Sequence, residues 1–492
     1  MKLSALISKL EIIEQTAPGE MEIRDISYDS RFTEKGDVFV AISGFETDGH
    51  HYIKDAVEKG AVLVICERKP DISVPYVLVG DARFALAEIS AAYFDYPAEK
   101  MQMIGVTGTN GKTTTTILLK NVLEACLGGK IGLIGTNDIQ IGKEIVETER
   151  TTPESYVLQK LLHQMQQAGC SHVVMEVSSH ALALHRVAGI TYTVSVFTNL
   201  SQDHLDFHKT MDAYAKAKAA LFAQSKVGII NIDDSYAPIM QEVAKKSNCE
   251  VLSYSIKQNE ADLMAKDIRL KPEGISFSTL IPGEILRVAL PIPGEFSVYN
   301  ALAVIGASLK LGLGLNKVSQ ALEAAGGVKG RVEAAPTDGE YTILIDYAHS
   351  PDALENVLKT VAQFAKGRVV TLFGCGGDRD STKRPLMGEV AARLSDFVIV
   401  TSDNPRTETP SKIIEDILPG VEKHKTPYVV IEDRVEAILH AMDHHEKGDV
   451  IILAGKGHET YQEINKVKHH LDEREVIAKH IETRGKGGGK HD

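Results

Sequence analysis

Residues 107–113 read Thr-Gly-Thr-Asn-Gly-Lys-Thr and lie between an apolar run, 101–106, and a stretch of helical periodicity, 113–127. A glycine-rich turn that joins a strand to a helix lets backbone N–H groups surround phosphate oxygens, and the helix N-terminus adds positive potential. We expect Lys112 to neutralise the β- and γ-phosphates of a nucleotide and the Thr113 hydroxyl to reach Mg²⁺. This turn therefore predicts a nucleotide site on an α/β framework.

The glycine spacing of this loop differs from the general phosphate loop. Five residues before Gly111 the chain has Val106, and Gly105 is one place away from the usual position. Taken alone, the loop leaves a ligase, a kinase and a switch ATPase open.

Strand-like apolar runs alternate with helical stretches from about residue 101, and a second series of the same kind begins near 341. This alternation predicts mostly parallel sheets covered by helices. Between the two series, 250–292 is expected to form antiparallel strands. With 492 residues, we predict an α/β protein of three domains. They are a small N-terminal α/β domain (1–99), a central phosphate-loop domain with a mostly parallel sheet (100–332) and a C-terminal Rossmann-like domain (333–492).

Charge and cysteine content restrict the class of protein. A net charge of −13 argues against nucleic acid or an anionic membrane surface as a partner. The five cysteines are odd in number and form no C-x-x-C pair, which is typical of a reduced intracellular protein without structural zinc. No apolar run approaches the 18 residues of a membrane span. We expect a soluble, cytoplasmic protein.

Polar motifs follow the predicted strands in both series. They are GTNGKT, EVSSH, TNLSQDH, DYAHSP, GCGGDRD, DNPR and GKGHE. Ligands of open α/β sheets bind at the carboxyl ends of the strands. The motifs therefore predict a site between the central and C-terminal domains.

One lysine lies on an apolar helix face. In 213–222, Tyr214, Lys218, Leu221 and Phe222 share a face, whereas Lys216 points elsewhere. Burying a charged lysine costs free energy unless its charge changes. The alternative is a lysine that extends its ammonium group to solvent.

The run TGTNGKTTT, followed in order by the other motifs, resembles the Mur ligase family over essentially the whole chain. The resemblance is nearest to the member that adds the third amino acid of the cell-wall peptide. It implies that ATP activates a carboxylate as an acyl phosphate, which an incoming amine then attacks, with release of phosphate. ATP and Mg²⁺ are the implied cofactors.

The resemblance also implies roles for the residues of the central site. The catalytic residues would be Lys112, Glu176, His204 and Lys218, with Lys218 carbamylated. Thr113, Glu176, His204 and the Lys218 carbamate would form the metal-binding set. The implied ATP contacts are Gly108, Thr109, Asn110, Gly111, Lys112, Thr113, Thr114, Asn300, Arg331, Asp346 and His349. By their residue types alone, Glu176 could be a solvated carboxylate and His204 a structural histidine.

Two further sets are implied for the substrates. Ser30 and Arg31 would hold the uridine diphosphate end, and Thr151, Thr152, Ser178 and Arg186 the muramoyl peptide. Leu184 departs from the family pattern, because relatives can carry Gln there. The amine set comprises Arg379, Asp403, Asn404, Pro405, Arg406, Gly455 and Glu459.

Arg406 and Glu459 would select the amine. meso-Diaminopimelate differs from lysine by a second carboxylate, for which a planar guanidinium is a matching fork, and Glu459 suits the far ammonium group. The alternative for Arg406 is a structural ion pair.

We therefore expect a monomeric ligase that joins meso-diaminopimelate to UDP-N-acetylmuramoyl-L-alanyl-D-glutamate and forms ADP and phosphate. The alternatives are a sibling ligase that adds lysine, a folylpolyglutamate-type ligase and a regulatory ATPase that makes no bond. A dinucleotide-binding oxidoreductase is disfavoured, because the first domain has no G-x-G-x-x-G after a strand.

Overall fold

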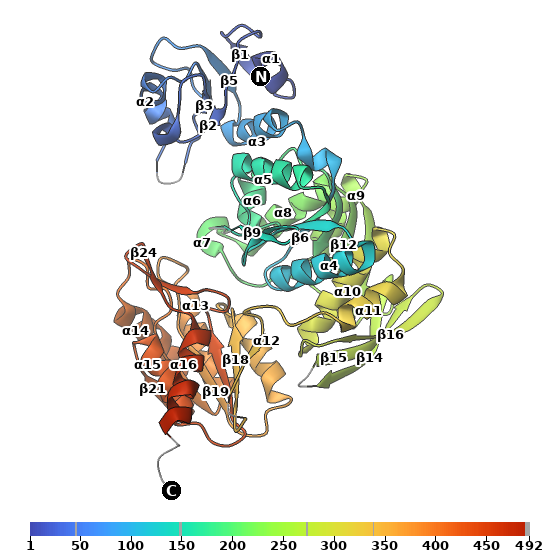
Figure 1. The fold of residues 1–492 in the computed structure, drawn as a ribbon, viewed down its shortest axis with the longest axis vertical. Helices are drawn as coiled ribbons and strands as arrows, with labels where there is room; N and C mark the ends of the chain where they lie inside the picture. The colour runs from blue at the N-terminus through green and yellow to red at the C-terminus, as the bar shows by residue number, and fades with distance from the viewer. Residues whose placement is uncertain (45–46, 147–149, 272–273, 338, 488–492) are drawn as a thin grey trace.

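The computed structural model describes residues 1–44, 47–146, 150–271, 274–337 and 339–487, with side chains up to 483. Figure 1 shows three α/β bodies, with the N-terminal body (blue) at one end, the central body next to it and the C-terminal body (orange to red) at the other end. No helix in the described part of the chain is long and apolar enough to cross a membrane.

The first body is a five-stranded sheet with the order β1-β5-β4-β3-β2, in which only β1 pairs antiparallel. Its strands are β1 (Ile12–Gln15), β2 (Ile26–Ser27), β3 (Val38–Val40), β4 (Leu63–Cys66) and β5 (Tyr76–Val79). Its helices are α1 (Leu3–Leu6), α2 (Ile53–Glu58) and α3 (Ala82–Tyr93). The Tyr156 hydroxyl donates to Asp25 at 2.8 Å, which joins this body to the central one.

The central body is built on an eleven-stranded sheet with the order β16-β15-β14-β13-β12-β11-β6-β10-β7-β8-β9. The strands are β6 (Gln102–Thr107), β7 (Lys130–Ile134), β8 (Ile139–Ile141), β9 (Glu144–Val146), β10 (Cys170–Glu176), β11 (Tyr192–Phe197), β12 (Ser225–Asn231), β13 (Glu250–Ser255), β14 (Leu263–Lys271), β15 (Gly274–Ile281) and β16 (Glu284–Leu290). The helices are α4 (Lys112–Leu127), α5 (Ser155–Gln167), α6 (Ser179–Ala183), α7 (Leu205–His208), α8 (Met211–Ala219), α9 (Ala237–Lys246), α10 (Glu295–Lys310) and α11 (Leu315–Glu323).

In the middle of the sheet, the neighbouring strands β14-β13-β12-β11-β6-β10-β7 pair in parallel. Antiparallel strands extend the sheet at both edges, β15 and β16 beside β14, and β8 and β9 beside β7. The prediction of antiparallel strands across 250–292 is confirmed for β14–β16 and is wrong for β13. That strand pairs in parallel with both β12 and β14. Helix α9 joins β12 to β13, and a helical crossover returns the chain in a parallel direction.

Strand β6 lies inside this sheet, between β10 and β11, and is buried from Met103 to Thr107. Gly105 gives it room, because a Cβ there would lie 2.9 Å from the ring of Tyr192. The helix that follows, α4, packs against α10 and α11 in the main apolar core. The phosphate loop is thus held between a buried strand and a buried helix.

The C-terminal body has a six-stranded sheet with the order β17-β18-β22-β19-β20-β21, parallel except for β17, and a separate hairpin of β23 and β24. The strands are β17 (Glu333–Ala335), β18 (Thr342–Asp346), β19 (Val369–Phe373), β20 (Phe397–Val400), β21 (Tyr428–Val430), β22 (Val450–Ala454), β23 (Tyr461–Ile464) and β24 (Val467–His470). The helices are α12 (Pro351–Ala362), α13 (Lys383–Leu394), α14 (Pro410–Val421), α15 (Arg434–Asp443) and α16 (Glu473–Gly487).

Two glycines let α13 and α14 approach closely. A Cβ at Gly388 would lie 2.4 Å from the Ile417 carbonyl oxygen, and one at Gly420 would lie 1.8 Å from the Pro385 carbonyl oxygen. These helices follow the strand-end loops 374–382 and 401–409. Their close contact therefore sets the two loops side by side.

We expect Gly420→Ala to lower the free energy of unfolding of the C-terminal body by about 2 kcal/mol or more, because the methyl group would overlap backbone rather than a movable side chain. The thermal midpoint of unfolding measures this. Gly326→Ala is the matched control, since a Cβ at Gly326 meets nothing within 4 Å. Equal midpoints for the two variants would contradict the packing argument.

Candidate functional site

The seven polar motifs begin where strands end, as predicted. Strands β6, β10 and β11 of the central sheet end at Thr107, Glu176 and Phe197. Strands β18, β19, β20 and β22 of the C-terminal sheet end at Asp346, Phe373, Val400 and Ala454. Parallel strands bring their carboxyl ends to one edge of each sheet, so the motifs gather there.

Two glycines with positive φ shape the phosphate loop. Gly108 has φ +153° and Gly111 has φ +85°, and a Cβ at these positions would lie 1.8 Å from Thr198 Oγ1 and 2.6 Å from Asn300 Oδ1. The loop is fixed by its neighbour after β11, because Asn199 Oδ1 accepts from the backbone N–H of Asn110 at 2.9 Å. The next residues, Thr113 and Thr114, are buried in the first turn of α4.

Two ammonium groups, of buried Lys218 and half-buried Lys112, converge on one carbonyl of this loop. Lys218 Nζ donates to the Gly108 oxygen at 2.7 Å, and Lys112 Nζ donates to the same oxygen at 3.0 Å and to the Thr109 oxygen at 2.9 Å. Lys218 is 1% exposed, so the alternative in which it reaches solvent is wrong. Burial, and next the charge of Lys112, lower the pKa of Lys218 well below its ordinary value. Burial also lowers the pKa of Lys112.

Glu176 is fully buried at the end of β10, so it is not a solvated carboxylate. Its Oε1 accepts from the Thr136 backbone N–H at 2.8 Å, and its Oε2 accepts from the Thr136 hydroxyl at 3.1 Å. The Thr136 and Thr151 hydroxyls are 3.0 Å apart. Thr136 is a contact that the sequence did not predict.

Three of the residues predicted for the muramoyl peptide are connected to the end of β10 through the Glu176 backbone. The Thr152 hydroxyl donates to the Glu176 carbonyl at 2.9 Å and accepts from the Ser178 N–H at 3.1 Å. Arg186 donates to the Thr152 carbonyl at 3.3 Å and pairs with Glu154 at 3.2 Å. Thr152, Ser178 and Arg186 are therefore one connected set.

His204 has φ +54°, and its ring lies edge-on to His180 with the ring centroids 4.9 Å apart. Burial lowers the pKa of His204, and the adjacent Asp203 opposes this. In turn, His204, His349 and Lys383 outweigh burial and lower the pKa of Asp203. Residues of the C-terminal body thus contribute to the charge around the central site.

The phosphate loop is contacted from the junction between the central and C-terminal bodies, through Arg331, and from the C-terminal body, through Asp352. Arg331 Nη2 donates to the Thr113 hydroxyl at 2.9 Å, and the Arg331 guanidinium lies 4.9 Å from the centre of the Tyr347 ring. Asp352 Oδ2 accepts from Asn110 Nδ2 at 2.9 Å and from the Ser201 hydroxyl at 3.0 Å. Asp352 was not predicted, because at the start of α12 an acidic residue looks like an ordinary helix-end charge.

The other predicted ATP contacts lie beside these residues. Asn300 is buried on α10, and its Oδ1 accepts from the Thr115 hydroxyl at 3.3 Å. Asp346 accepts from the Val332 N–H at 2.7 Å, and burial raises its pKa. His349 Nδ1 lies 2.8 Å from the Tyr347 carbonyl, and burial lowers the pKa of His349 to about 4.

Four of the residues predicted for the amine form one cluster. Asn404 Nδ2 donates to Glu459 Oε2 at 2.8 Å, and a Cβ at Gly455 would lie 2.7 Å from Asp403 Oδ2. The centre of this cluster is Lys456, which sequence reasoning passed over although it lies inside GKGHE.

Arg406 has φ +52°, and its Nη1 donates to the Gly377 carbonyl at 2.8 Å. Its Nε forms an ion pair with Glu463 at 3.2 Å, so the structural ion pair is present. A Cβ at Gly377 would lie 1.9 Å from the Pro405 carbonyl, which shows how closely the two loops pack. Arg379 is exposed and donates to the Asp378 carbonyl at 3.0 Å.

Ser30 and Arg31 are not brought to this cluster. They lie in the first body, where Arg31 pairs with Asp29 at 2.6 Å and Ser30 accepts from Lys59 at 2.9 Å through its carbonyl. Figure 1 shows that body on the other side of the central one from the C-terminal body.

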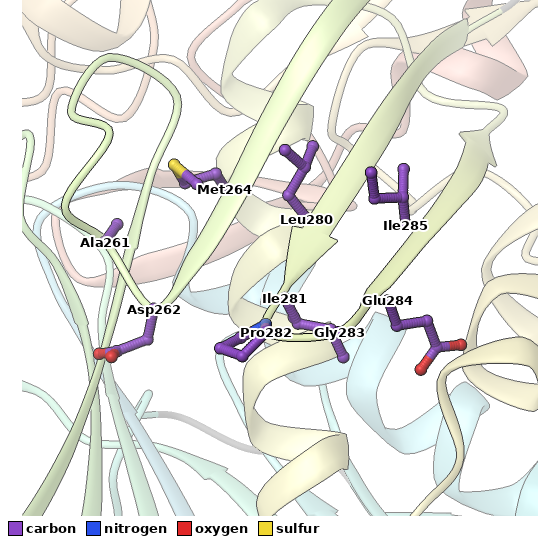
Figure 2. Close-up of a pocket in the computed structure, with 9 residues that line it drawn as sticks. All are labelled: Ala261, Asp262, Met264, Leu280, Ile281, Pro282, Gly283, Glu284 and Ile285. Atoms are coloured by element: carbon purple, nitrogen blue, oxygen red, sulfur yellow. The ribbon is translucent and has the colours of Figure 1, made fainter.

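Two surface hollows lie away from the strand-end residues, on β14–β16. One, of about 420 Å³, is lined by Ala261, Asp262, Met264, Leu280, Ile281, Pro282, Gly283, Glu284 and Ile285. Figure 2 shows Pro282 and Gly283 at the turn between β15 and β16, and Ala261, Asp262 and Met264 on the neighbouring segment at the start of β14. The other, of about 550 Å³, is lined by Asp267, Ile268, Arg269, Ser278 and Arg287. None of the predicted site residues lines either hollow.

Two sheets with polar loops at their carboxyl ends, and a glycine-rich phosphate loop held between a buried strand and a buried helix, define an α/β nucleotide-binding protein of several domains. Three family models match the chain: the catalytic domain of the Mur ligase family over residues 22–107, the Mur ligase middle domain over 106–308, and the glutamate ligase domain of Mur ligases over 330–457. The chain belongs to the Mur ligase family.

Individual relatives are similar in sequence to this chain over nearly its whole length. A UDP-N-acetylmuramoyl-L-alanyl-D-glutamate–2,6-diaminopimelate ligase of Clostridioides difficile is 46% identical over 480 residues, 97% of this chain and 98% of the relative. The protein of the same name from Caldanaerobacter subterraneus subsp. tengcongensis is 48% identical over 93% of this chain and 94% of its own. A solved structure of a ligase of that name has a TM-score of 0.71 at 32% identity, with 99% of both chains covered. The MurF structure from Acinetobacter baumannii, at 20% identity, TM-score 0.65 and 98% of both chains, shares the fold.

Lys218→Met should reduce the dependence of stability on pH. Because burial lowers the pKa of Lys218 below 10.5, the folded chain binds fewer protons at this residue than the unfolded chain between the lowered value and 10.5. Stability therefore rises with pH in that window, by up to about 1.4 kcal/mol per pH unit, and is lowest below it. Thermal midpoints in CO₂-free buffers from pH 7 to 10 should rise in the wild type relative to the variant. Parallel curves would contradict a lowered pKa for Lys218.

Proposed function

We propose that this chain joins meso-diaminopimelate to the D-glutamate of UDP-N-acetylmuramoyl-L-alanyl-D-glutamate, with ATP converted to ADP and phosphate. The reaction belongs to the synthesis of the peptidoglycan precursor and takes place in the cytoplasm. The observation that carries the proposal is the presence of two strand-end sites in one chain: a phosphate loop on which Lys112 and buried Lys218 converge, and an acidic cluster beside Arg406. Relatives with 43–48% identity that bear the name of this ligase support it.

ATP binds at the phosphate loop. Backbone N–H groups of 108–114 surround the phosphates, and Lys112 turns from the Gly108 and Thr109 carbonyls to the β- and γ-phosphates. Arg331 approaches from the junction between the two bodies and His349 from the C-terminal body, and Asn300 and Asp346 complete the nucleotide contacts. Transfer of the γ-phosphoryl group to the D-glutamate carboxylate gives an acyl phosphate, which the amine attacks as phosphate leaves. Catalysis is mainly positioning and neutralisation of charge.

The residues at the loop fit Mg²⁺. No group of three or more His, Cys, Asp or Glu side chains in the described part of the chain is arranged as a metal cage. Mg²⁺ needs no such cage, because one or two carboxylates and substrate phosphates usually hold it. Glu176 and the Thr113 hydroxyl supply oxygen ligands of this kind, and His204 lies close to the same loop. When bound, the ion neutralises phosphate charge.

Lys218 suits carbamylation. Its lowered pKa increases the fraction of neutral amine, which can attack CO₂ to give a carbamate with release of a proton. The carbamate would carry a negative charge beside Lys112, whereas the present ammonium group of Lys218 is repelled by Lys112. It would offer Mg²⁺ a further oxygen ligand besides Glu176 and the Thr113 hydroxyl.

The amine-binding loops account for the choice of diaminopimelate. Two donors of the Arg406 guanidinium are already engaged by Gly377 and Glu463, so the group is held in place for a substrate carboxylate. Glu459 and Asp403 provide the negative charge for the far ammonium group. Lysine lacks the second carboxylate and would leave Arg406 without its substrate partner.

The remaining assignments extend the site to the sugar nucleotide. Ser30 and Arg31 hold the uridine diphosphate end, and Thr151, Thr152, Ser178 and Arg186 hold the muramoyl peptide near Glu176. Residues 1–99, 100–332 and 333–492 form the domains for the sugar nucleotide, ATP and the amine, and the enzyme acts as a monomer.

The decisive experiment offers the purified chain ATP, Mg²⁺ and the UDP-muramoyl dipeptide with either meso-diaminopimelate or L-lysine. We expect phosphate release and a product heavier by one diaminopimelate residue, as measured by mass spectrometry. Product with lysine alone would support the sibling ligase instead. ATP turnover that is independent of both substrates would support a regulatory ATPase.

Arg406→Ala should raise the KM for diaminopimelate about 10- to 100-fold, because charge-assisted hydrogen bonds are lost, and leave the KM for ATP nearly unchanged. Steady-state kinetics with each substrate varied in turn measure both. Arg393→Ala is the control, since that exposed side chain pairs with Glu355 on the outside of the same body. Equal losses for both substrates would assign Arg406 to folding rather than to recognition.

A further inference from the structure

Lys456 is a fully buried lysine that none of the roles above uses. It follows β22, between Gly455 and Gly457, and none of its side chain is exposed. Its ammonium group donates to Asp403 Oδ1 at 3.3 Å, to Asn404 Oδ1 at 3.0 Å and to Glu459 Oε2 at 3.2 Å. An ammonium group has three donors, so these three contacts match its full capacity.

The contacts of Lys456 join two loops that are far apart in sequence. Asp403 and Asn404 follow β20, whereas Glu459 follows β22. Strands β20 and β22 are not neighbours, because β19 lies between them. The two loops are joined by hydrogen bonds of their own, such as that from Asn404 to Glu459, and the ammonium group of Lys456 is the one group that contacts Asp403, Asn404 and Glu459 together among the described residues.

Lys456 also sets the orientation of its partners. Asn404 Oδ1 accepts from Lys456 and from the Glu463 N–H at 2.9 Å, so the Asn404 amide must turn its Nδ2 toward Glu459. Both bonds to Glu459 end on Oε2. Within the described residues no hydrogen bond ends on Oε1, the second oxygen of that carboxylate.

We propose that Lys456 is a positioning residue for the amine substrate: it holds Glu459 by one oxygen and presents the other to the far ammonium group of the incoming diamino acid. The inference rests on the proposed function and deepens it. The charges agree with this role, because one ammonium between the Asp403 and Glu459 carboxylates leaves a net charge of −1 for a cationic substrate group. Without Lys456 the two carboxylates would repel each other in a buried place.

A double-mutant cycle tests the proposal, with Lys456→Met, Glu459→Gln and the double variant compared with the wild type. We expect each single variant to raise the KM for diaminopimelate about tenfold or more, with the KM for ATP and for the UDP-muramoyl dipeptide within about twofold of wild type. The double variant should resemble Glu459→Gln, because Lys456 acts through Glu459. Lys456→Arg keeps the charge and should recover part of the loss.

Arg368→Met is the matched control. Arg368 forms an ion pair with buried Asp449 at 2.7 Å, in the same body but at the amino ends of β19 and β22. The Arg368→Met variant should have a lower thermal midpoint of unfolding and an unchanged KM for diaminopimelate. The double variant removes both charges of the Lys456–Glu459 pair together, so it can be measured even where Lys456→Met alone folds poorly.

The outcomes separate the two proposals. A wild type that forms no product from diaminopimelate overturns the proposed function. An active wild type whose KM for diaminopimelate is unchanged in Lys456→Met, or whose single effects multiply in the double variant, overturns the role of Lys456. If Lys456→Met raises the KM for ATP as much as the KM for diaminopimelate, the role of Lys456 is also overturned, because equal rises indicate a structural role alone.

Discussion

The carbonyl oxygen of Gly108 accepts hydrogen bonds from two lysines, and the geometry of the central site depends on this convergence. Two ammonium groups so close together repel, and burial makes the charge of each more costly. The lowered pKa of Lys218 is the result. A site that brings cations together in this way is suited to anions, and the phosphates of ATP supply them. Because burial and the charge of Lys112 lower its pKa, Lys218 can change its charge more readily than an exposed lysine.

The contacts between bodies follow from where parallel strands end. Both large sheets have polar loops at their carboxyl edges. Arg331, at the junction between the two bodies, and Asp352, in the C-terminal body, contact the phosphate loop. The cluster around Lys456 lies at the carboxyl edge of the C-terminal sheet. The phosphate loop therefore has contacts from outside the central sheet, whereas the Lys456 cluster belongs to the C-terminal body alone. The proposed reaction, in which an amine attacks an activated acid, agrees with this division.

Much of the fold could be predicted from local pattern, whereas most of the candidate site residues were assigned through the resemblance to the Mur ligase family. The strand–loop–helix period placed the seven motifs at strand ends. The apolar face of 213–222 included Lys218, but only the structure shows that its side chain is buried. The direction of β13 could not be predicted, because strand direction depends on the crossover helix rather than on the strand's own residues. The contacts of Asp352 and Thr136 could not be predicted for a similar reason, because their hydrogen-bond partners are distant in sequence.

The amino-acid sequence by itself determined the class of site: glycines where the backbone must adopt positive φ, a lysine and a threonine at the start of α4, and charged motifs after apolar strands. These are local properties, set by residue type and spacing. Only the tertiary structure decided which charges meet. It brought Lys456 between Asp403 and Glu459, engaged Arg406 with Glu463, and aimed two lysines at one carbonyl. The interaction of charges depends on distance and burial, and neither quantity is local in sequence.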